Sequence, residues 1–197
     1  MRPFPFENRT PENTATTVLS QSLNVGKLST WGADLEVNYG FEATDLFGAV
    51  PGRVDLRFLG SYQPKLLTQP ILGGAITNGA GVNGVSKLRL NLTVAYSNDV
   101  WSLAVNQRWK SKQRAFAEPI VSIIPDADAY AYTDVSVDYK LRGVADDLVL
   151  FANVQNLFDK NPPIFGTVAG APGLVSPYGV GYDVVGRYYT VGVRAKF

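Results

Sequence analysis

The sequence predicts an all-β fold, an antiparallel transmembrane β-barrel segment of about seven long strands that form an incomplete barrel. Three observations support this prediction. Apolar and polar residues alternate over long stretches, short and long connections alternate along the chain, and aromatic residues stand near the ends of the apolar rows. Alternation with a period of two places one set of side chains on each face of a strand.

The strands follow from the alternation, taken from the N-terminus. Residues 1–23 are polar and irregular and are predicted to form a loop, whereas residues 24–197 are predicted to form the barrel strands. The seven predicted strands span residues 29–42, 54–63, 87–96, 101–110, 131–141, 148–154 and 185–197. No stretch shows a convincing helical period.

The connections between these strands alternate in length. Those after the first, third and fifth strands are short, and the other three are long and rich in Gly and Pro, at residues 64–86, 116–129 and 159–182. Antiparallel strands would therefore place all short turns at one end of the sheet and all long loops at the other. We expect the long loops to have no secondary structure of their own, and loops of this length are usually functional or disordered.

A soluble β-sandwich would also show alternating strands. The predicted strands are longer than the usual five to six residues of globular proteins, which favours a membrane barrel. Trp101 and Trp109 share one face of one strand and would lie about 21 Å apart along the membrane normal, one in each interface. The polar residues would then face a hydrated lumen: Asp34, Glu36, Asn38, Glu42, Asp55, Arg57, Lys87, Arg89, Asn106, Arg108, Asp134, Asp138, Arg194 and Lys196.

The composition limits the chemistry. The 197 residues include no Cys and no His, which removes disulfides, Cys-based metal sites and the commonest general base. The net charge of +1 gives no global attraction to nucleic acid. The chain has no catalytic triad, phosphate-binding loop or metal-ligand spacing, and its Asp pairs lie in loops and turns, where Asp is common. We expect no enzyme activity, no cofactor and no metal.

Three stretches carry a specific resemblance. The first comprises residues 23–27 and 31–36, the second is residues 153–160, and the third is residues 186–197. They resemble the C-terminal barrel region of TonB-dependent outer-membrane receptors. The second stretch contains the motif Asn-Leu-Phe-Asp that ends the penultimate strand in that family, here Asn156, Leu157, Phe158 and Asp159.

The last strand resembles the signal read by the outer-membrane barrel assembly machinery. Its apolar row ends in a C-terminal Phe and comprises Tyr189, Val191, Val193, Ala195 and Phe197. Addition of this strand to an exposed sheet edge would give a physical basis for recognition. If the first strand runs toward the periplasm, the seventh does as well. The C-terminus then lies in the periplasm, as the resemblance implies, and residues 1–23 belong to an extracellular loop.

The resemblance implies a receptor in the outer membrane of a Gram-negative bacterium that takes up a scarce small molecule, such as a ferric siderophore, cobalamin or an oligosaccharide. The chain would contact lipid and supply barrel wall and three extracellular loops. Within these loops the candidate ligand-binding residues are Asn78, Asn83, Phe116, Glu118, Phe165 and Tyr178, with Tyr62, Tyr130 and Tyr182 as further aromatic candidates.

Seven strands leave unpaired edges, which a membrane sheet has to close. A plugged transporter of this kind has about 22 strands. We therefore expect this sequence to be roughly the last third of a receptor barrel, without signal peptide or N-terminal plug, and to meet the TonB complex only through that plug. Two alternatives stay open: a soluble β-sandwich that binds a ligand or carbohydrate, and a small passive barrel with one more strand drawn from residues 10–23.

Overall fold

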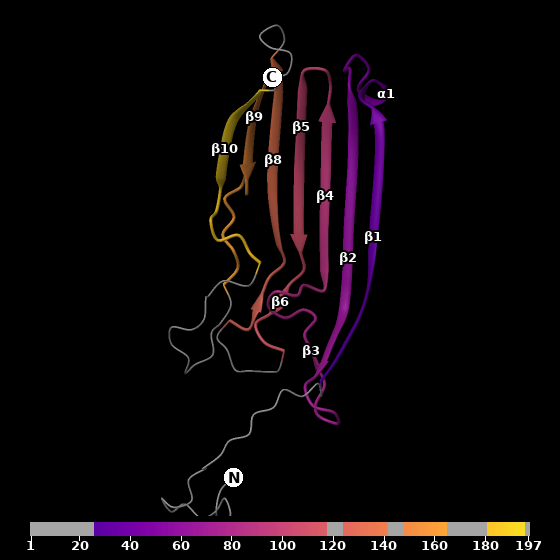
Figure 1. The fold of residues 1–197 in the computed structure, drawn as a ribbon, viewed down its shortest axis with the longest axis vertical. Helices are drawn as coiled ribbons and strands as arrows, with labels where there is room; N and C mark the ends of the chain where they lie inside the picture. Colours follow the sequence, from indigo (N-terminus) through magenta and orange to yellow (C-terminus); the bar gives the residue numbers. More distant parts are fainter. Residues whose placement is uncertain (1–25, 118–123, 142–147, 165–180, 196–197) are drawn as a thin grey trace, which may run out of the picture.

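The computed structural model describes residues 26–117, 124–141, 148–164 and 181–195. They form one antiparallel sheet of eight strands in the order β1-β2-β4-β5-β8-β9-β10, with β3 paired to β2 (Figure 1). The strands are β1 (Lys27–Glu42), β2 (Arg53–Gln69), β3 (Thr77–Asn78), β4 (Leu88–Ser97), β5 (Trp101–Lys110), β8 (Tyr130–Leu141), β9 (Leu148–Gln155) and β10 (Tyr188–Ala195). The prediction of an all-β antiparallel fold with seven long strands is confirmed.

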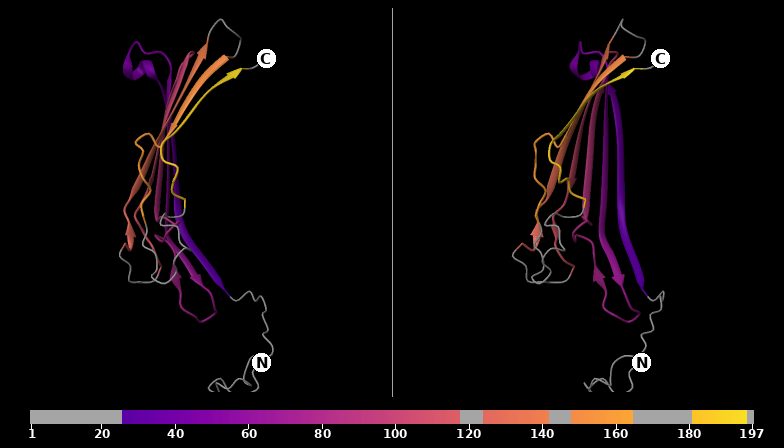
Figure 2. Two further views of the ribbon diagram at one scale, coloured as in Figure 1. Left: turned by 90° about the vertical axis from the view of Figure 1, so that its left-hand side faces the viewer. Right: turned by 60° about the vertical axis from the view of Figure 1, so that its left-hand side comes forward.

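The sheet is a single twisted layer that does not close on itself. Figure 2 shows it nearly edge-on, with the strands fanning apart toward one end. Among the described strands β1 pairs only with β2 and β10 only with β9, so each outer strand has one open edge. The structure therefore agrees with an incomplete barrel.

Cross-strand register separates the two faces of the sheet. One row of directly opposed apolar residues crosses all seven long strands: Tyr39, Leu56, Val94, Val105, Val135, Val154 and Tyr189. The next row along five of these strands is polar: Asn38, Arg57, Thr93, Asn106 and Asp134. We call these two sides the apolar face and the polar face of the sheet.

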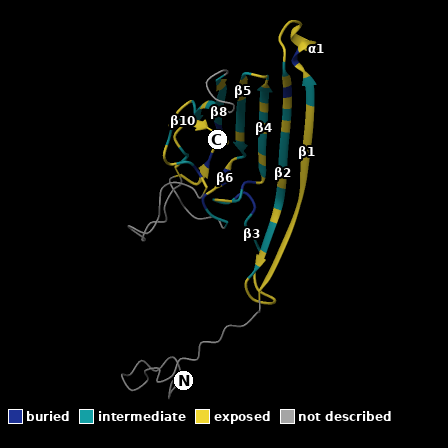
Figure 3. Ribbon diagram, turned by 45° about the horizontal axis from the view of Figure 1, so that its top comes forward, coloured by how far each residue is buried: buried dark blue, intermediate teal, exposed yellow. Residues whose placement is uncertain are grey.

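The apolar face is open to its surroundings. Val191 is 80% exposed, and much of the face remains accessible on the outer strands (Figure 3). Aromatic residues gather at both of its ends. Trp101 and Tyr139 lie 4.4 Å apart between ring centroids near the short turns, whereas Trp31 and Tyr62 lie 6.5 Å apart near the long loops. Such an apolar band between two aromatic belts is typical of a sheet that faces lipid.

The expectation that the long loops have no secondary structure is wrong. β2 continues to Gln69 and pairs there with β3, and β6 (Gln113–Arg114) pairs with β7 (Asp126–Ala127). The segment between β1 and β2 forms a short helix, α1 (Ala43–Phe47), where no helix was expected. These elements are too short to produce a periodic pattern in the sequence, which explains why alternation alone missed them.

The strand ends also differ from the expected ones. β10 begins at Tyr188 rather than at residue 185. β1 begins at Lys27, because a register shift between Trp31 and Ala33 lets it keep pairing with the extended end of β2. Such a β-bulge adds a residue to one strand and increases the local twist.

Gly32 lies at this bulge, where a side chain would not fit. A Cβ atom at Gly32 would lie 2.6 Å from the backbone carbonyl oxygen of Tyr62, whereas one at Gly26 would have no atom closer than 3.5 Å. We expect Gly32→Ala to lower the free energy of unfolding in urea by about 1–3 kcal/mol. Gly26→Ala is the matched control and should leave it unchanged. Equal effects of the two substitutions would contradict this account of the bulge.

Candidate functional site

The polar face of the sheet carries a network of ion pairs. Arg57 Nη2 lies 3.0 Å from Glu36 Oε1, and Arg108 Nη2 lies 2.8 Å from Asp134 Oδ2. The Asn106 amide donates to the Asn91 side chain at 2.9 Å. Since these groups come from neighbouring strands, the contacts join the strands on this face. A polar surface of this kind is typical of the lumen side of a membrane barrel.

A second group of charges lies near the short turns. Arg53 on β2 donates from Nε to Asp55 at 2.9 Å and lies 3.8 Å from Glu42 on β1. Gly40 makes room for this group, because a Cβ atom there would lie 2.1 Å from the Arg53 guanidinium. The charges of this face are therefore largely paired at the short-turn end of β1 and β2.

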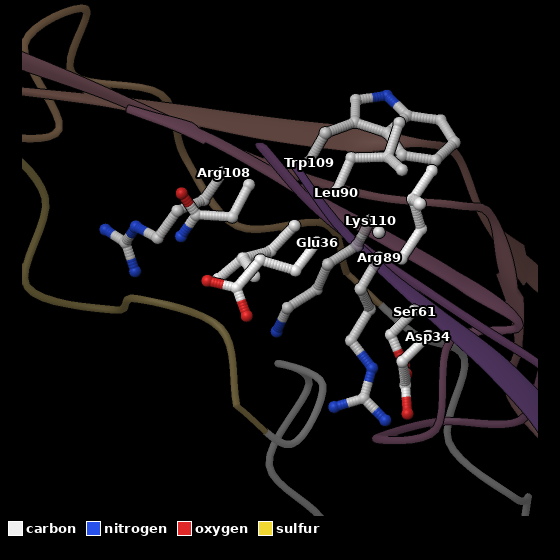
Figure 4. A pocket seen from close by; sticks show the side chains of 12 residues that line it. Asp34, Glu36, Ser61, Arg89, Leu90, Arg108, Trp109 and Lys110 are labelled. Atoms are coloured by element: carbon white, nitrogen blue, oxygen red, sulfur yellow. The ribbon is translucent and has the colours of Figure 1, made fainter. Parts of the chain in front are cut away.

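A hollow of about 440 Å³ opens on the polar face toward the long-loop end of β1, β2, β4 and β5. Figure 4 shows that six polar side chains of its wall point to one side of the sheet, whereas Trp109 and Leu90 point to the other. The six are Asp34, Glu36, Ser61, Arg89, Arg108 and Lys110. Two carboxylates and three cations therefore share one concave surface.

Beside this hollow, buried polar side chains connect three loops into what we call the rim cluster, formed by Ser86, Gln113 and Tyr182. Gln113 is only 2% exposed. Its Nε2 donates to Ser86 Oγ at 2.6 Å and to the Tyr182 hydroxyl at 2.8 Å, and its Oε1 accepts from the Gly84 backbone N–H at 2.9 Å. Every polar atom of the Gln113 side chain is thus used to join segments far apart in sequence.

Aromatic rings extend the rim cluster toward β8. Tyr130 lies 4.4 Å from Tyr132 and 5.5 Å from Tyr182 between ring centroids, both in edge-to-face geometry. The Tyr132 hydroxyl accepts from the Asp183 backbone N–H at 2.9 Å. Burial raises the pKa of the Tyr182 phenol, and the neighbouring Tyr132 raises it further. Tyr182 therefore stays neutral in the pH range of cells.

The candidate loop residues occupy different environments. Asn78 braces its own loop, since its Oδ1 accepts from the Leu66 N–H at 3.1 Å and its Nδ2 donates to the Pro64 carbonyl at 3.1 Å. Phe116 packs against the hydrophobic cluster that contains Tyr130, Tyr132 and Tyr182. Asn83 is half-buried, and its backbone N–H donates to the Arg114 carbonyl. The structure does not bring these three together at one ligand site.

The other loop candidates divide into two groups. Tyr130 and Tyr182 lie in or beside the rim cluster, whereas Tyr62 contacts Trp31 on the apolar face. Glu118, Phe165 and Tyr178 lie outside the described residues. Contact of any of these residues with a ligand stays a prediction.

The Asn-Leu-Phe-Asp motif forms the turn that ends β9. Asn156 and Asp159 adopt left-handed backbone conformations, with φ of 51° and 52°, which Asn and Asp tolerate better than other residues. Asn156 is 1% exposed, and its side chain bonds both the N–H and the carbonyl of Lys160.

The same motif reaches across two neighbouring strands. The Asn156 backbone N–H donates to Asp134 Oδ1 on β8 at 2.9 Å, and Asp159 Oδ1 accepts from the Arg187 N–H, just before β10, at 2.9 Å. Leu157 donates its N–H to the Thr133 carbonyl, and Phe158 is 72% exposed. The motif therefore fixes where β8, β9 and β10 meet.

The expected assembly signal lies on the apolar face of the edge strand β10. Tyr189, Val191 and Val193 are each at least 60% exposed, and Ala195 is also exposed. Phe197, the last member of the row, lies outside the described residues. An exposed row on an open edge is compatible with strand addition, and the recognition itself stays a prediction.

The described residues contain no group of three or more His, Cys, Asp or Glu side chains that could hold a metal ion. In that same part of the chain no helix is long and apolar enough to cross a membrane.

Sequence reasoning missed Gln113 and Ser86 as structural residues. Their partners are 27 and 69 positions away along the chain, so no local pattern signals the contact. Lys110 was not singled out either, although its place at the end of an alternating strand could have drawn attention to the loop boundary.

The role of Gln113 in holding the loops of the rim cluster together can be tested. Gln113→Leu keeps the approximate volume but leaves the Gly84 N–H without its acceptor and removes the donor to Ser86 and Tyr182. We expect a loss of about 1–3 kcal/mol in local opening free energy, measured by amide hydrogen exchange in the segments around these residues. The exposed neighbour Lys112 is the control, because Lys112→Gln should leave exchange unchanged. Unaltered protection in Gln113→Leu would contradict the proposed bracing.

Comparison with known proteins agrees with this architecture. A family model described as TonB dependent receptor-like, beta-barrel matches residues 5–157, which is more than half of the chain. The match includes Asn156 and Leu157 of the motif and ends there. A comparison with curated proteins gave no match. On the family match and the open antiparallel sheet, the chain belongs to the family of TonB-dependent receptor-like β-barrels.

Proposed function

We propose that this chain forms part of the barrel wall and three extracellular loops of an outer-membrane receptor that takes up a scarce small molecule with energy from the TonB complex. Family membership supports an outer-membrane receptor role in general. The observation that carries the proposal is the sheet with an exposed apolar face between aromatic belts and a charged face behind it. This is the surface that a barrel wall presents to lipid and to its lumen.

The two open edges support the proposal that further strands complete the barrel. In lipid, unpaired backbone N–H and C=O groups destabilise a sheet by several kcal/mol each, so β1 and β10 need partners. A soluble sandwich would instead cover the apolar face with a second sheet. No second large sheet packs on that face within the described part of the chain.

We propose an orientation as well. The short turns and the end of β10 face the periplasm, whereas β3, β6, β7 and the rim cluster face the outside, with residues 1–23 in an extracellular loop. Capture of ligand would take place on the loop side, and assembly would begin from the exposed row of β10. The ligand could be a siderophore, cobalamin or an oligosaccharide.

The absence of Cys in the sequence allows a direct test of orientation. Ile71 near the β2–β3 turn is 66% exposed and Leu46 in α1 is 69% exposed, so the two positions are matched in access. We expect a membrane-impermeant maleimide to label Ile71→Cys on intact cells and Leu46→Cys only after lysis. The reverse pattern would contradict the orientation, and equal labelling of a soluble species would contradict a membrane location.

A second prediction tests the lipid face. Val105 lies midway along β5 on the apolar face, and its neighbour Ala104 points to the polar face. We expect Val105→Arg to disfavour insertion by about 2–4 kcal/mol, because the charge would lie near the bilayer midplane. Ala104→Arg is the matched control. The amount of folded protein in the outer membrane measures both, and equal loss from the two substitutions would contradict the assignment of the faces.

A further inference from the structure

One cross-strand row on the polar face differs from the others in its charges. Register places Asp34, Ser61, Arg89, Lys110 and Tyr130 directly opposite one another in that order. Within it Arg89 on β4 and Lys110 on β5 are immediate neighbours. Like charges directly opposite each other on neighbouring strands are destabilising, so this pair is unfavourable unless something negative lies between them.

Within the described residues, the sheet places no carboxylate in contact with this pair, although Asp34 and Glu36 line the same hollow. Among the described residues no carboxylate lies within ion-pair distance of Arg89 or Lys110, whereas Arg57 and Arg108 on the same face each have one. Asp34 shares the row but is two strands from Arg89, which is about 10 Å at the usual strand spacing. Ser61 stands between them.

Lys110 is held in place by neutral groups. Its Nζ donates to the Gly181 carbonyl at 2.6 Å and lies 4.8 Å from the centroid of the Tyr182 ring. The rim cluster fixes Tyr182 through Gln113, so the position of the ammonium depends on a braced loop. An ammonium has three donors, and the Gly181 carbonyl uses one of them.

Arg89 is exposed and points into the same hollow, as Figure 4 shows. A guanidinium offers a planar fork that matches the two oxygens of a carboxylate or phosphate. A fixed ammonium beside an accessible guanidinium is therefore a suitable arrangement for one oxyanion.

The long-loop end of the sheet adds further positive charge. Lys87, Lys112 and Arg114 line a second hollow next to the first, together with one carboxylate, Asp126. A concave surface with an excess of cations raises the local concentration of anions and speeds their association. The field therefore favours anions that reach the sheet from the loop side.

We propose that Arg89 and Lys110 bind a carboxylate or phosphate group of the ligand, which makes the ligand of this receptor an anion. This inference rests on the proposed function, because the polar face is then the inner wall that a ligand meets after passing the loops. The occupant is a small molecule from the loop side. Bracing of Lys110 by Gly181 and Tyr182 makes the site preformed, so that little ordering accompanies binding.

Citrate and pyrophosphate are suitable probes because they carry the two oxyanion types, and a neutral maltooligosaccharide serves as the negative probe. Binding is measured by isothermal titration calorimetry on the full protein extracted from outer membranes in detergent. We expect binding of at least one anion, weakened at least tenfold by Arg89→Gln or Lys110→Gln and by raised salt. Lys110→Arg should keep most of the affinity.

Lys140→Gln is the control, since Lys140 lies at the short-turn end of β8, far along the sheet from Arg89. Heat-modifiable gel mobility checks that each variant is folded. Absence of anion binding in the folded wild-type protein would overturn the inference, as would equal loss in Lys140→Gln. Either result leaves the membrane location intact, because labelling at Ile71 and Leu46 tests that separately.

Discussion

The rest of the structure depends on one continuous ladder of antiparallel backbone hydrogen bonds from β1 to β10. Because side chains alternate along each strand, the register decides which residues meet lipid and which meet the lumen, and a slip of one position would exchange the two faces. The apolar row from Tyr39 to Tyr189 holds over seven strands only because every pair keeps this register. The bulge at Trp31 and Ala33 is the one shift in the β1–β2 ladder, and it lies beyond this row toward the long loops.

The connections at the two ends of the sheet are stabilised in different ways. At the short-turn end, local hydrogen bonds are enough to order the compact connections. In one of them, Asn98 Oδ1 accepts from the backbone N–H groups of Val100 and Trp101. At the loop end, long segments are ordered around a small hydrophobic cluster that contains Tyr130, Tyr132 and Tyr182. Buried polar contacts add to this cluster: Gln113 joins three loops, and Asn156 closes the turn after β9. Such contacts are directional and fix a single arrangement when every donor and acceptor is used.

The contrast between local and long-range contacts explains which features could be predicted from the sequence. All seven long strands were predicted at their observed places, since alternation over eight or more residues is a strong local signal, but the extension of β2 to Gln69 was missed. β3, β6 and β7 have two residues each and leave no such signal. Asn78 was expected at a ligand site because polar loop residues often bind ligands, yet its side chain bonds its own loop. The motif around Asn156 was predicted as a strand end, but its burial and its bond to Asp134 depend on tertiary contacts that local pattern does not report.

The cations on the polar face fall into two groups: those that stabilise the sheet through an ion pair, and those that we propose bind the ligand. Where a cation stabilises the sheet, a carboxylate of the same or the adjacent strand lies within ion-pair distance of it, as for Arg57 with Glu36 and Arg108 with Asp134. Arg89 and Lys110 face each other without such a group among the described residues, and so lower the stability of the β4–β5 pairing instead of raising it. The neutral support given to Lys110 by Gly181 and Tyr182 holds its charge in place without neutralising it. An unneutralised charge kept in a fixed position can stabilise an incoming anion more than it could stabilise the empty sheet, which is what a binding wall requires.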